Sequence, residues 1–324
     1  MKKFMKGCAI TALIFIVLGL ILGVGGSLGH GSARFSLGEI LSAVTLGRIS
    51  GEEVDDWSDG VTEQIQENMG DVHYDLEDNV DFDSAYEVQT GTVESYVLGD
   101  RHQGITELNV EAGGCVMTIQ ASKDDSFRVE AGGMRRFQGY VEDGTMEIRG
   151  TSKVRTNSGE NLNGWIHLYV PEGYYFEQAV LDLGAGSLTV ENLQTGNLEA
   201  HVGAGQIIFH ALDADQATLD CGMGQLVVDD LYSRTVDATV GMGSLRLTGD
   251  VTEQLTGDCS MGELKATLAG EQTDFDYDLN CGMGELKVGD DSYNGLAQEK
   301  QISNNASKTM ELDCAMGSIV VEFE

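Results

Sequence analysis

Basic residues are the scarcest charged residues in this sequence. The 324 residues include 19 lysines and arginines against 53 aspartates and glutamates, and the formal net charge is −34. A protein that binds nucleic acid neutralises phosphates with a basic patch, and no such patch can be found here. The charge therefore argues against a nucleic-acid partner. It suits a protein of an acidic cell surface, or one that binds cations or basic partners.

Motifs of the common catalytic and metal sites are missing from the sequence as well. It contains no GxSxG, HExxH or CxxC, no GGxGxD calcium repeat and no EF-hand loop. Nothing in the sequence places a nucleophile beside a base. We therefore expect no enzyme, with no catalytic residue, no cofactor and no metal site. The enzymatic alternative is a glycosidase, because two carboxylates on one face of a β-helix could perform that chemistry.

One phrase, a pair of apolar runs around a glycine corner, occurs seven times. It reads LDLGAGSLTVENL from residue 181, LDCGMGQLVVDDL from 219 and LNCGMGELKVGDD from 279. The first four steps between corners are 19 residues, and the next two are 22 and 33. A fixed period of about 20 residues is typical of stacked coils rather than of one active site. The first corner residues are Gly184, Gly203, Gly222, Gly241, Ser260, Gly282 and Ala315.

Apolar and polar residues alternate on both sides of each corner. This period of two predicts a strand with one buried face before the corner and another after it. One such unit, here called a rung, cannot bury its apolar face alone, so neighbouring rungs must stack. The sequence therefore predicts an all-β, single-chain β-solenoid of about 19-residue rungs with glycine corners. The inward pairs after the corner are Leu188/Val190, Ile207/Phe209, Leu226/Val228, Leu245/Leu247, Leu264/Ala266, Leu286/Val288 and Ile319/Val321.

The corners themselves could also be interpreted as phosphate cradles. That function requires a helix after the glycine loop, with its amino end facing the anion. Each corner here leads into another predicted strand. We therefore interpret the glycines as turn residues that adopt the positive φ of a sharp corner.

The β-solenoid domain is predicted to span 86–324, with regular rungs over 181–324. Residues 86–180 form a degenerate part, in which LNVEAGGC and FRVEAGGM share VEAGG at an offset of 19 residues. Residues 290–308 form a polar excursion between the last two rungs, which we expect to be a loop or a short helix.

The beginning of the chain has a different character. Three lysines precede the apolar run GCAITALIFIVLGLILGVGG, which is long enough to cross a bilayer as a helix. Lysines before such a run favour an inside amino terminus. We expect a cytoplasmic tail over 1–6, a single-pass transmembrane anchor over 7–27 and an extracellular β-domain. A cleaved signal peptide is the alternative, because small residues follow the run.

Residues 28–85 are expected to hold an amphipathic helix and an acidic linker. Ser36 and Glu39 have the spacing of a capping box, and apolar residues after Ser36 fall on one helical face. Residues 51–100 include 16 acidic residues and no lysine or arginine. Such a segment buries little apolar surface, so we expect an extended spacer that holds the β-domain away from the membrane.

Sulfur-containing residues occupy two columns of the repeat. Cys221, Cys259, Cys281 and Cys314 share one column, and aliphatic residues fill it in the other rungs. Such substitution is typical of core packing, so we interpret both columns as core. The alternatives are a disulfide between neighbouring rungs, such as Cys259 and Cys281, and a soft-metal site. The second column contains Met223, Met242, Met261, Met283 and Met316.

The outward column before the corner is acidic. Taken in sequence order, its acids fall on every second rung, which keeps their mutual repulsion low. We interpret this column as a solvated face, and a calcium site along it is the alternative. The column is Asp182, His201, Asp220, Thr239, Asp258, Asn280 and Asp313.

The sequence also resembles a known bacterial family. The segment LYVPEGYYF is followed by LDLGAGSLTVENL, LDCGMGQLVV and LNCGMGELKV, behind an N-terminal apolar segment. This arrangement resembles the putative-adhesin family, β-strand-repeat domains of unknown function that are grouped with the toast-rack envelope proteins. The resemblance covers 86–324 and implies a stack of β-strand repeats without catalytic residues.

The expected function follows from this resemblance and from the predicted anchor. We expect a membrane-anchored extracellular β-repeat protein that acts as an adhesin or as a cell-surface binding or structural module. Its partners would be the membrane and a surface ligand or envelope protein. Related toast-rack proteins are associated with envelope stress signalling in Gram-positive bacteria. The alternative is therefore a cell-envelope stress sensor or regulator that works through a membrane partner.

Overall fold

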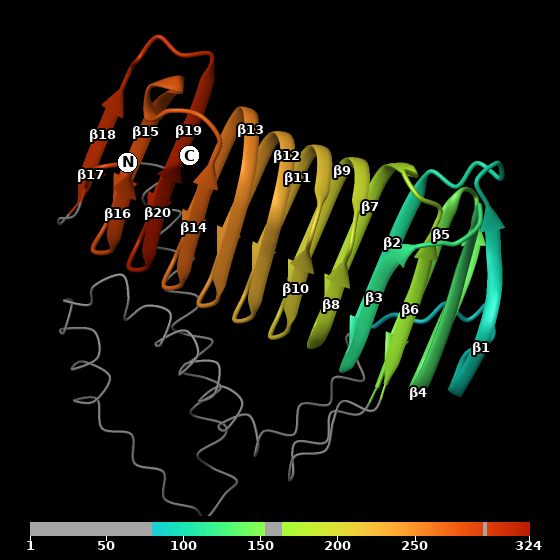
Figure 1. Ribbon diagram of the computed structural model, residues 1–324. Helices are drawn as coiled ribbons and strands as arrows, with labels where there is room; N and C mark the ends of the chain where they lie inside the picture. The colour runs from blue at the N-terminus through green and yellow to red at the C-terminus, as the bar shows by residue number, and fades with distance from the viewer. Residues whose placement is uncertain (1–79, 153–163, 294–296) are drawn as a thin grey trace, which may run out of the picture. The chain divides into compact units, whose positions relative to one another are not determined.

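The predicted all-β class and its solenoid-like β fold are confirmed. The computed structural model describes residues 80–152, 164–293 and 297–324, which fold as strands and one short 3-10 helix, η3 (Gln272–Asp274). Figure 1 shows the strands of this part side by side in a stack, with β1 at one end and β17 and β18 at the other. A single apolar core lies between the two faces of the stack.

Two ladders of parallel strands form these faces. Each rung contributes one strand to each ladder, and the long strands β12 (Gln225–Val240) and β13 (Ser244–Cys259) bend and contribute to both. The first ladder runs through β5 (Thr145–Thr151), β2 (Glu107–Gly113), β7 (Tyr175–Leu183), β9 (Leu193–Val202), β11 (Leu212–Cys221), the later halves of β12 and β13, β19 (Lys308–Cys314) and β15 (Phe275–Cys281).

The second ladder is built in the same way from the strands that follow the corners. Its pairing is also parallel throughout. It runs through β6 (Trp165–Val170), β3 (Cys115–Ala121), β8 (Gly186–Val190), β10 (Gln206–Phe209), the first parts of β12 and β13, β14 (Glu263–Leu268), β20 (Ser318–Phe323) and β16 (Glu285–Val288).

The register of the ladders stacks equivalent residues of the repeat. Leu212 is paired with Leu193 on one side and with Leu231 on the other. Ile207 lies in the same way between Leu188 and Leu226. All of these side chains are buried, with exposures of 2% or less. Like residues therefore form continuous apolar columns, and each rung covers the core face of the next.

The order of the rungs differs from the order of the sequence at both ends. The rung β2/β3 lies between β5/β6 and β7/β8, although it precedes both along the chain. Likewise, the last rung of the chain, β19/β20, lies between β13/β14 and β15/β16. At the carboxyl end the chain forms the outer rung β15/β16 first and then returns to fill the gap with β19/β20. At the amino end it forms the inner rung β2/β3 first and the outer rung β5/β6 afterwards.

Antiparallel strands close the two ends of the stack. At one end, β4 (Ser126–Glu142) pairs with β5 and β6, and β1 (Gln89–Asp100) pairs with β4. At the other end, β18 (Gln298–Ile302) pairs with β15, and β17 (Asp291–Ser292) pairs with β16. These strands occupy the edges to which another chain could add. The shared VEAGG sequences therefore do not form adjacent rungs, because the second one lies in the antiparallel strand β4.

The corner glycines serve a different purpose from the predicted one. Among the corner glycines of residues 181–324, only Gly186 has a positive φ in the range that favours glycine. At Gly205, a Cβ atom would lie 2.5 Å from the carbonyl oxygen of Gly186 in the neighbouring rung, and at Gly224 it would meet the carbonyl oxygen of Gly205. Close approach between rungs, rather than turn conformation, therefore requires glycine at the second corner position.

Several predictions from the first part of the sequence lie outside the described residues. These are the tail, the anchor, the amphipathic helix and most of the linker. Among the residues that the structure does describe, no helix has the length and apolar character to cross a membrane.

Candidate functional site

The acidic outward column lies on the first ladder, where its members pair in register. Asp258 is paired with Asp313, and Asp313 is paired with Asn280. The acids therefore do not occupy every second rung, as the sequence order suggested, because the inserted rung brings Asp258 and Asp313 together. Along the stack the column reads Asp182, His201, Asp220, Thr239, Asp258, Asp313 and Asn280.

Neighbouring side chains partly compensate the charge of this column. His201 Nδ1 lies 2.9 Å from an Asp220 carboxylate oxygen, and Asn280 Nδ2 donates to Asp313 at 3.1 Å. Burial raises the pKa of both Asp182 and Asp313 above the usual range of an aspartate. Partial burial therefore disfavours the charged forms of these two carboxyl groups.

A second acidic column runs beside the first and was missed by the sequence reasoning. Its residues lie two positions earlier in each rung, so the period of two on the outward face could have revealed it. Burial, and then the charge of Asp220, raise the pKa of Asp237. Together, the two columns are called the acidic face. Along the stack the second column reads Val180, Glu199, Thr218, Asp237, Thr256, Glu311 and Asp278.

The outward face of the second ladder carries a different composition. Arg246, Lys265 and Lys287 stand on it, together with apolar side chains such as Ile208 and Val227. Lys265 Nζ lies 3.3 Å from a carboxylate oxygen of Glu322 on the neighbouring strand. The two broad faces of the stack therefore differ in charge, and negative charge predominates on the first ladder.

The cysteine column is part of the core, as predicted. The five cysteines that the structure describes are buried and free. However, Cys259 and Cys281 do not lie in neighbouring rungs, because Cys314 pairs with both. Burial raises the pKa of Cys221 and of Cys281 to about 11, so these thiols stay protonated at neutral pH.

Each cysteine of this column also donates a hydrogen bond to a backbone carbonyl oxygen of its own corner. The Sγ atom of Cys221 donates to the carbonyl oxygen of Gly224 at 3.1 Å, and Cys259 makes the same contact with Gly262 at 3.1 Å. Cys281 and Cys314 repeat this contact at their own corners. These carbonyl oxygens also accept backbone amides, as Gly224 does from Ser244, so the thiol adds a second hydrogen bond that an aliphatic residue at this position cannot make.

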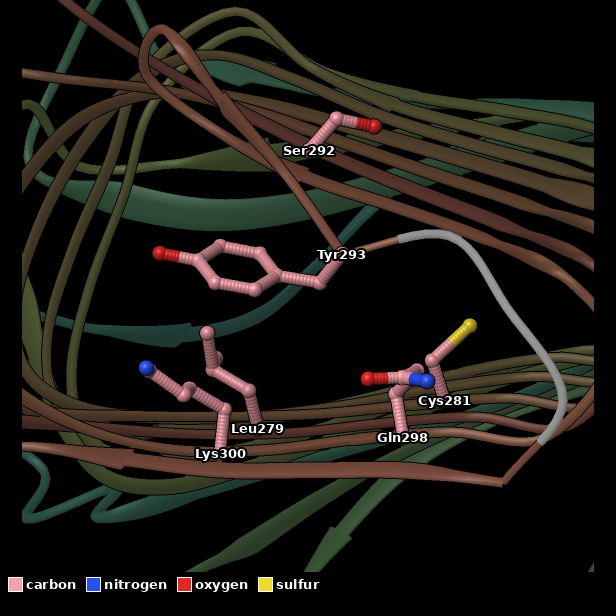
Figure 2. Close-up of a pocket in the computed structure, with 6 residues that line it drawn as sticks. All are labelled: Leu279, Cys281, Ser292, Tyr293, Gln298 and Lys300. Carbon is pink, nitrogen blue, oxygen red and sulfur yellow. The ribbon is translucent and has the colours of Figure 1, made fainter.

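A pocket of about 200 Å³ opens at the end of the core beneath the last strands. Figure 2 shows Tyr293 across from Leu279 and Lys300, with Gln298 beside Cys281. The strand β18 supplies Gln298 and Lys300, which are the partners of Cys281 and Leu279 in the antiparallel pairing. The pocket is lined by Leu279, Cys281, Ser292, Tyr293, Gln298 and Lys300.

The chemistry of this pocket is not that of a cysteine nucleophile. A nucleophilic cysteine needs a lowered pKa, whereas burial raises the pKa of Cys281 to about 11. Burial, followed by the charge of Asp291, likewise raises the pKa of Tyr293. Among the described residues, no cluster of three or more histidine, cysteine, aspartate or glutamate side chains could hold a metal ion.

The methionine column was predicted to be core, and this prediction is wrong. The exposed fractions of Met223, Met242 and Met283 are 47%, 40% and 65%. The column lies at the middle residue of each corner, where the chain turns from one ladder to the other and the side chain points outward. Its earlier members are alanines, of which Ala185 is buried.

The stacked ladders and outward columns define a β-strand-repeat protein with two broad outward faces. The sequence pattern of the family described as Toastrack DUF4097 matches residues 105–320. The chain therefore belongs to this family. No curated protein matches it.

Several solved structures are similar to this chain at low identity. A putative adhesin from Bacteroides fragilis is 13% identical, with a TM-score of 0.38, and the match covers 72% of this chain and 97% of that one. A putative cell adhesion protein from Clostridium sporogenes is 10% identical, with a TM-score of 0.33 and coverages of 74% and 100%. A putative lipid binding protein from Parabacteroides distasonis is 15% identical, with a TM-score of 0.34 and coverages of 69% and 95%.

Proposed function

We propose that this protein is a membrane-anchored extracellular adhesin or cell-surface binding module, and that it binds its ligand through the acidic face. The apolar run over 7–27 is the proposed anchor, with the amino terminus inside. The acidic linker holds the β-domain away from the bilayer. Adhesion is the activity named for similar proteins from Bacteroides fragilis and Clostridium sporogenes.

The binding surface is proposed to be a product of the repeat. In this proposal the β-domain is a single-chain β-solenoid of about 19-residue rungs with glycine corners. The pairing of Leu212 with Leu193 and Leu231, each 19 residues away, supports this unit. Stacking places the same outward positions of each rung side by side, so a short repeat forms a long face. Repeat proteins use such faces for extended contacts.

The observation that carries the proposal is the in-register acidic face. A flat array of carboxylates attracts basic groups or bridging cations across many weak contacts, instead of enclosing a small molecule. Burial, and then neighbouring carboxylates, raise the pKa of Asp182, Asp237 and Asp313, so a positive ligand on this face would favour their charged forms. Binding through this face should weaken as salt increases.

The experiment measures binding of the labelled full-length protein to three surfaces. These are the producer's isolated cell wall, vesicles of its extracted lipids, and beads coated with host-type mucin or matrix. Each surface is tested with calcium and with a chelator. Saturable binding to the foreign surface supports adhesion, and loss of that binding with chelator would mean that calcium bridges the acidic face.

The other outcomes redirect or overturn the proposal. Binding only to the producer's own wall or lipids would favour the envelope stress sensor or regulator. In that case a pull-down with the anchor segment should recover a membrane partner. Binding to none of the three surfaces would contradict a surface-binding function.

A further inference from the structure

The corner methionines form one continuous row. Their backbone amides link successive rungs: Met242 donates to Gly222 at 2.7 Å, Met261 to Gly241 at 2.8 Å, and Met283 to Ala315 at 2.7 Å. Met316 donates to Ser260 at 2.8 Å, which places it between Met261 and Met283. This row is called the methionine ridge. Along the stack it reads Met223, Met242, Met261, Met316 and Met283.

The fold itself does not require methionine at this position. The same corner position holds Ala185 and Ala204 in the two rungs before the ridge, and the Ala204 amide donates to Gly184 at 2.8 Å, as the ridge amides do to their neighbouring rungs. Three ridge methionines are at least 40% exposed, so they give up much of the stabilisation that burial would provide. Packing therefore does not explain why methionine replaces alanine in five successive rungs.

The geometry suits a ligand that binds thioethers. Rungs are spaced by about 4.8 Å, and a methionine side chain has three rotatable bonds. Two or three neighbouring sulfur atoms can therefore converge on one ion without moving the backbone. Thioether sulfur is a soft ligand that selects Cu(I)-type ions over calcium or magnesium.

We propose that the methionine ridge binds soft monovalent metal ions of the Cu(I) and Ag(I) class through the thioethers of adjacent rungs. The acidic character of the chain, with a formal net charge of −34, raises the local concentration of cations around the ridge. Glu263 and Glu285, which lie two residues after Met261 and Met283, add negative charge at the same corners.

The buried thiols are the competing ligands for such an ion. The cysteine column lies on the core side of the same corners, and Cys259 and Cys314 are at most 2% exposed. An ion that enters from solvent reaches the ridge first. The test must therefore report on the thioethers themselves rather than on total metal bound.

The experiment uses the full-length protein with ¹³C-labelled methionine methyl groups, titrated with Ag(I) in a chloride-free buffer. Silver is chosen because it stays monovalent, and single Met→Leu variants assign the signals. We expect the methyl signals of the ridge to shift. The signals of the core residues Met117, Met146 and Met310, which are at most 1% exposed, should remain in place.

Affinity provides the second measurement. The double variant Met242→Leu/Met316→Leu leaves no two ridge methionines in adjacent rungs, so it should weaken Ag(I) binding about tenfold or more. The matched control Met117→Leu/Met146→Leu should bind as the unaltered protein does. Equal shifts of core and ridge signals, or Ag(I) binding without a ridge shift, would overturn the proposal and point to the thiols. An equal response to calcium would do the same.

Discussion

At the scale of single residues, the second corner glycine is the position with the least freedom to change. All seven corners of 181–324 have glycine there, whereas the first position also accepts Ser260 and Ala315. The carbonyl oxygen of the neighbouring rung lies where a Cβ atom would stand at Gly205 and at Gly224. Ser260 and Ala315 show that the repeat accepts a side chain at the first corner position, whereas the neighbouring carbonyl oxygen lies closer at the second.

Replacing Gly224 by alanine should destabilise the protein. The added Cβ atom would meet the carbonyl oxygen of Gly205, and separating the two rungs should cost about 1–3 kcal/mol. Gly184→Ala is the matched control, because its Cβ atom would lie 3.9 Å from the nearest oxygen and should change stability by less than about 0.5 kcal/mol. Urea unfolding of both variants measures the difference, and equal stabilities would contradict close approach as the reason for glycine.

Two aspartates should respond to pH in opposite directions. Burial raises the pKa of Asp237 in the folded protein, so its contribution to stability is full below the pKa of the unfolded chain and is lost as pH rises. Asp276 accepts backbone hydrogen bonds from Ala306 and Asn304, which lower its pKa. Its contribution is therefore present above the unfolded pKa and is lost as pH falls.

The variants Asp237→Asn and Asp276→Asn measure this difference. At pH 7 the first should stabilise the protein or leave it unchanged, because it removes a charge that burial disfavours. The second should destabilise it, because the turn after β18 loses a charged acceptor. As the pH falls towards 4, the Asp237→Asn difference should shrink, whereas the Asp276→Asn difference should persist, because the pKa of Asp276 lies below the ordinary aspartate value of 3.8. Thermal unfolding from pH 4 to 7 tests this, and effects of the same sign at pH 7 would contradict the assigned environments.

At the scale of elements, the sequence predicts the strands and their inward faces but not the order of the rungs. Alternation of apolar residues correctly placed Leu188, Ile207 and Leu226 in the core. It carries no information about which rung is the neighbour, because each rung presents nearly the same apolar column. The polar segment 290–308 was the one signal in the sequence for the end of the stack. Its strand β18 is exposed at four of five positions, as expected of a strand that covers an end.

The same limit applies to the candidate surfaces. The first acidic column was predicted, but the contact between Asp258 and Asp313 depends on rung order and could not be. The methionine column was assigned to the core because alanine substitutes for it, and alanine also fits an exposed corner. Position within the repeat was clear from the sequence, whereas the direction of the side chain at the corner required the structure.

An engineered disulfide tests the inserted rung directly. Thr256 pairs with Glu311 on the next strand, and Glu311 pairs with Asp278. Cysteines at 256 and 311 would be about 4.8 Å apart between Cα atoms, within the range of a disulfide. Cysteines at 256 and 278 would be about twice as far apart, which exceeds that range. After mild oxidation, mass spectrometry should find the first cross-link and not the second. The reverse result would restore the sequential order.

At the scale of the whole stack, antiparallel strands close both ends, and no further strand of the described residues covers its two broad faces. The antiparallel strands β1 and β4 cover one end, and β17 and β18 cover the other, so further growth by strand pairing is opposed. The open faces differ in charge, with the acidic columns on the first ladder. Because of this difference in charge, the first ladder is the proposed contact surface, and substitutions on the second ladder serve as controls for it.

The central claim is that binding depends on the acidic face rather than on net charge. It is tested by comparing two triple variants on whichever surface binds the unaltered protein. The variant Asp220→Asn/Asp237→Asn/Asp258→Asn changes the acidic face, and Glu263→Gln/Glu285→Gln/Glu322→Gln changes the second ladder by the same charge. We expect the first to lower affinity about tenfold, or about 1.4 kcal/mol, and the second to change it less than about twofold. Equal losses, or no loss from the first variant, would contradict the account.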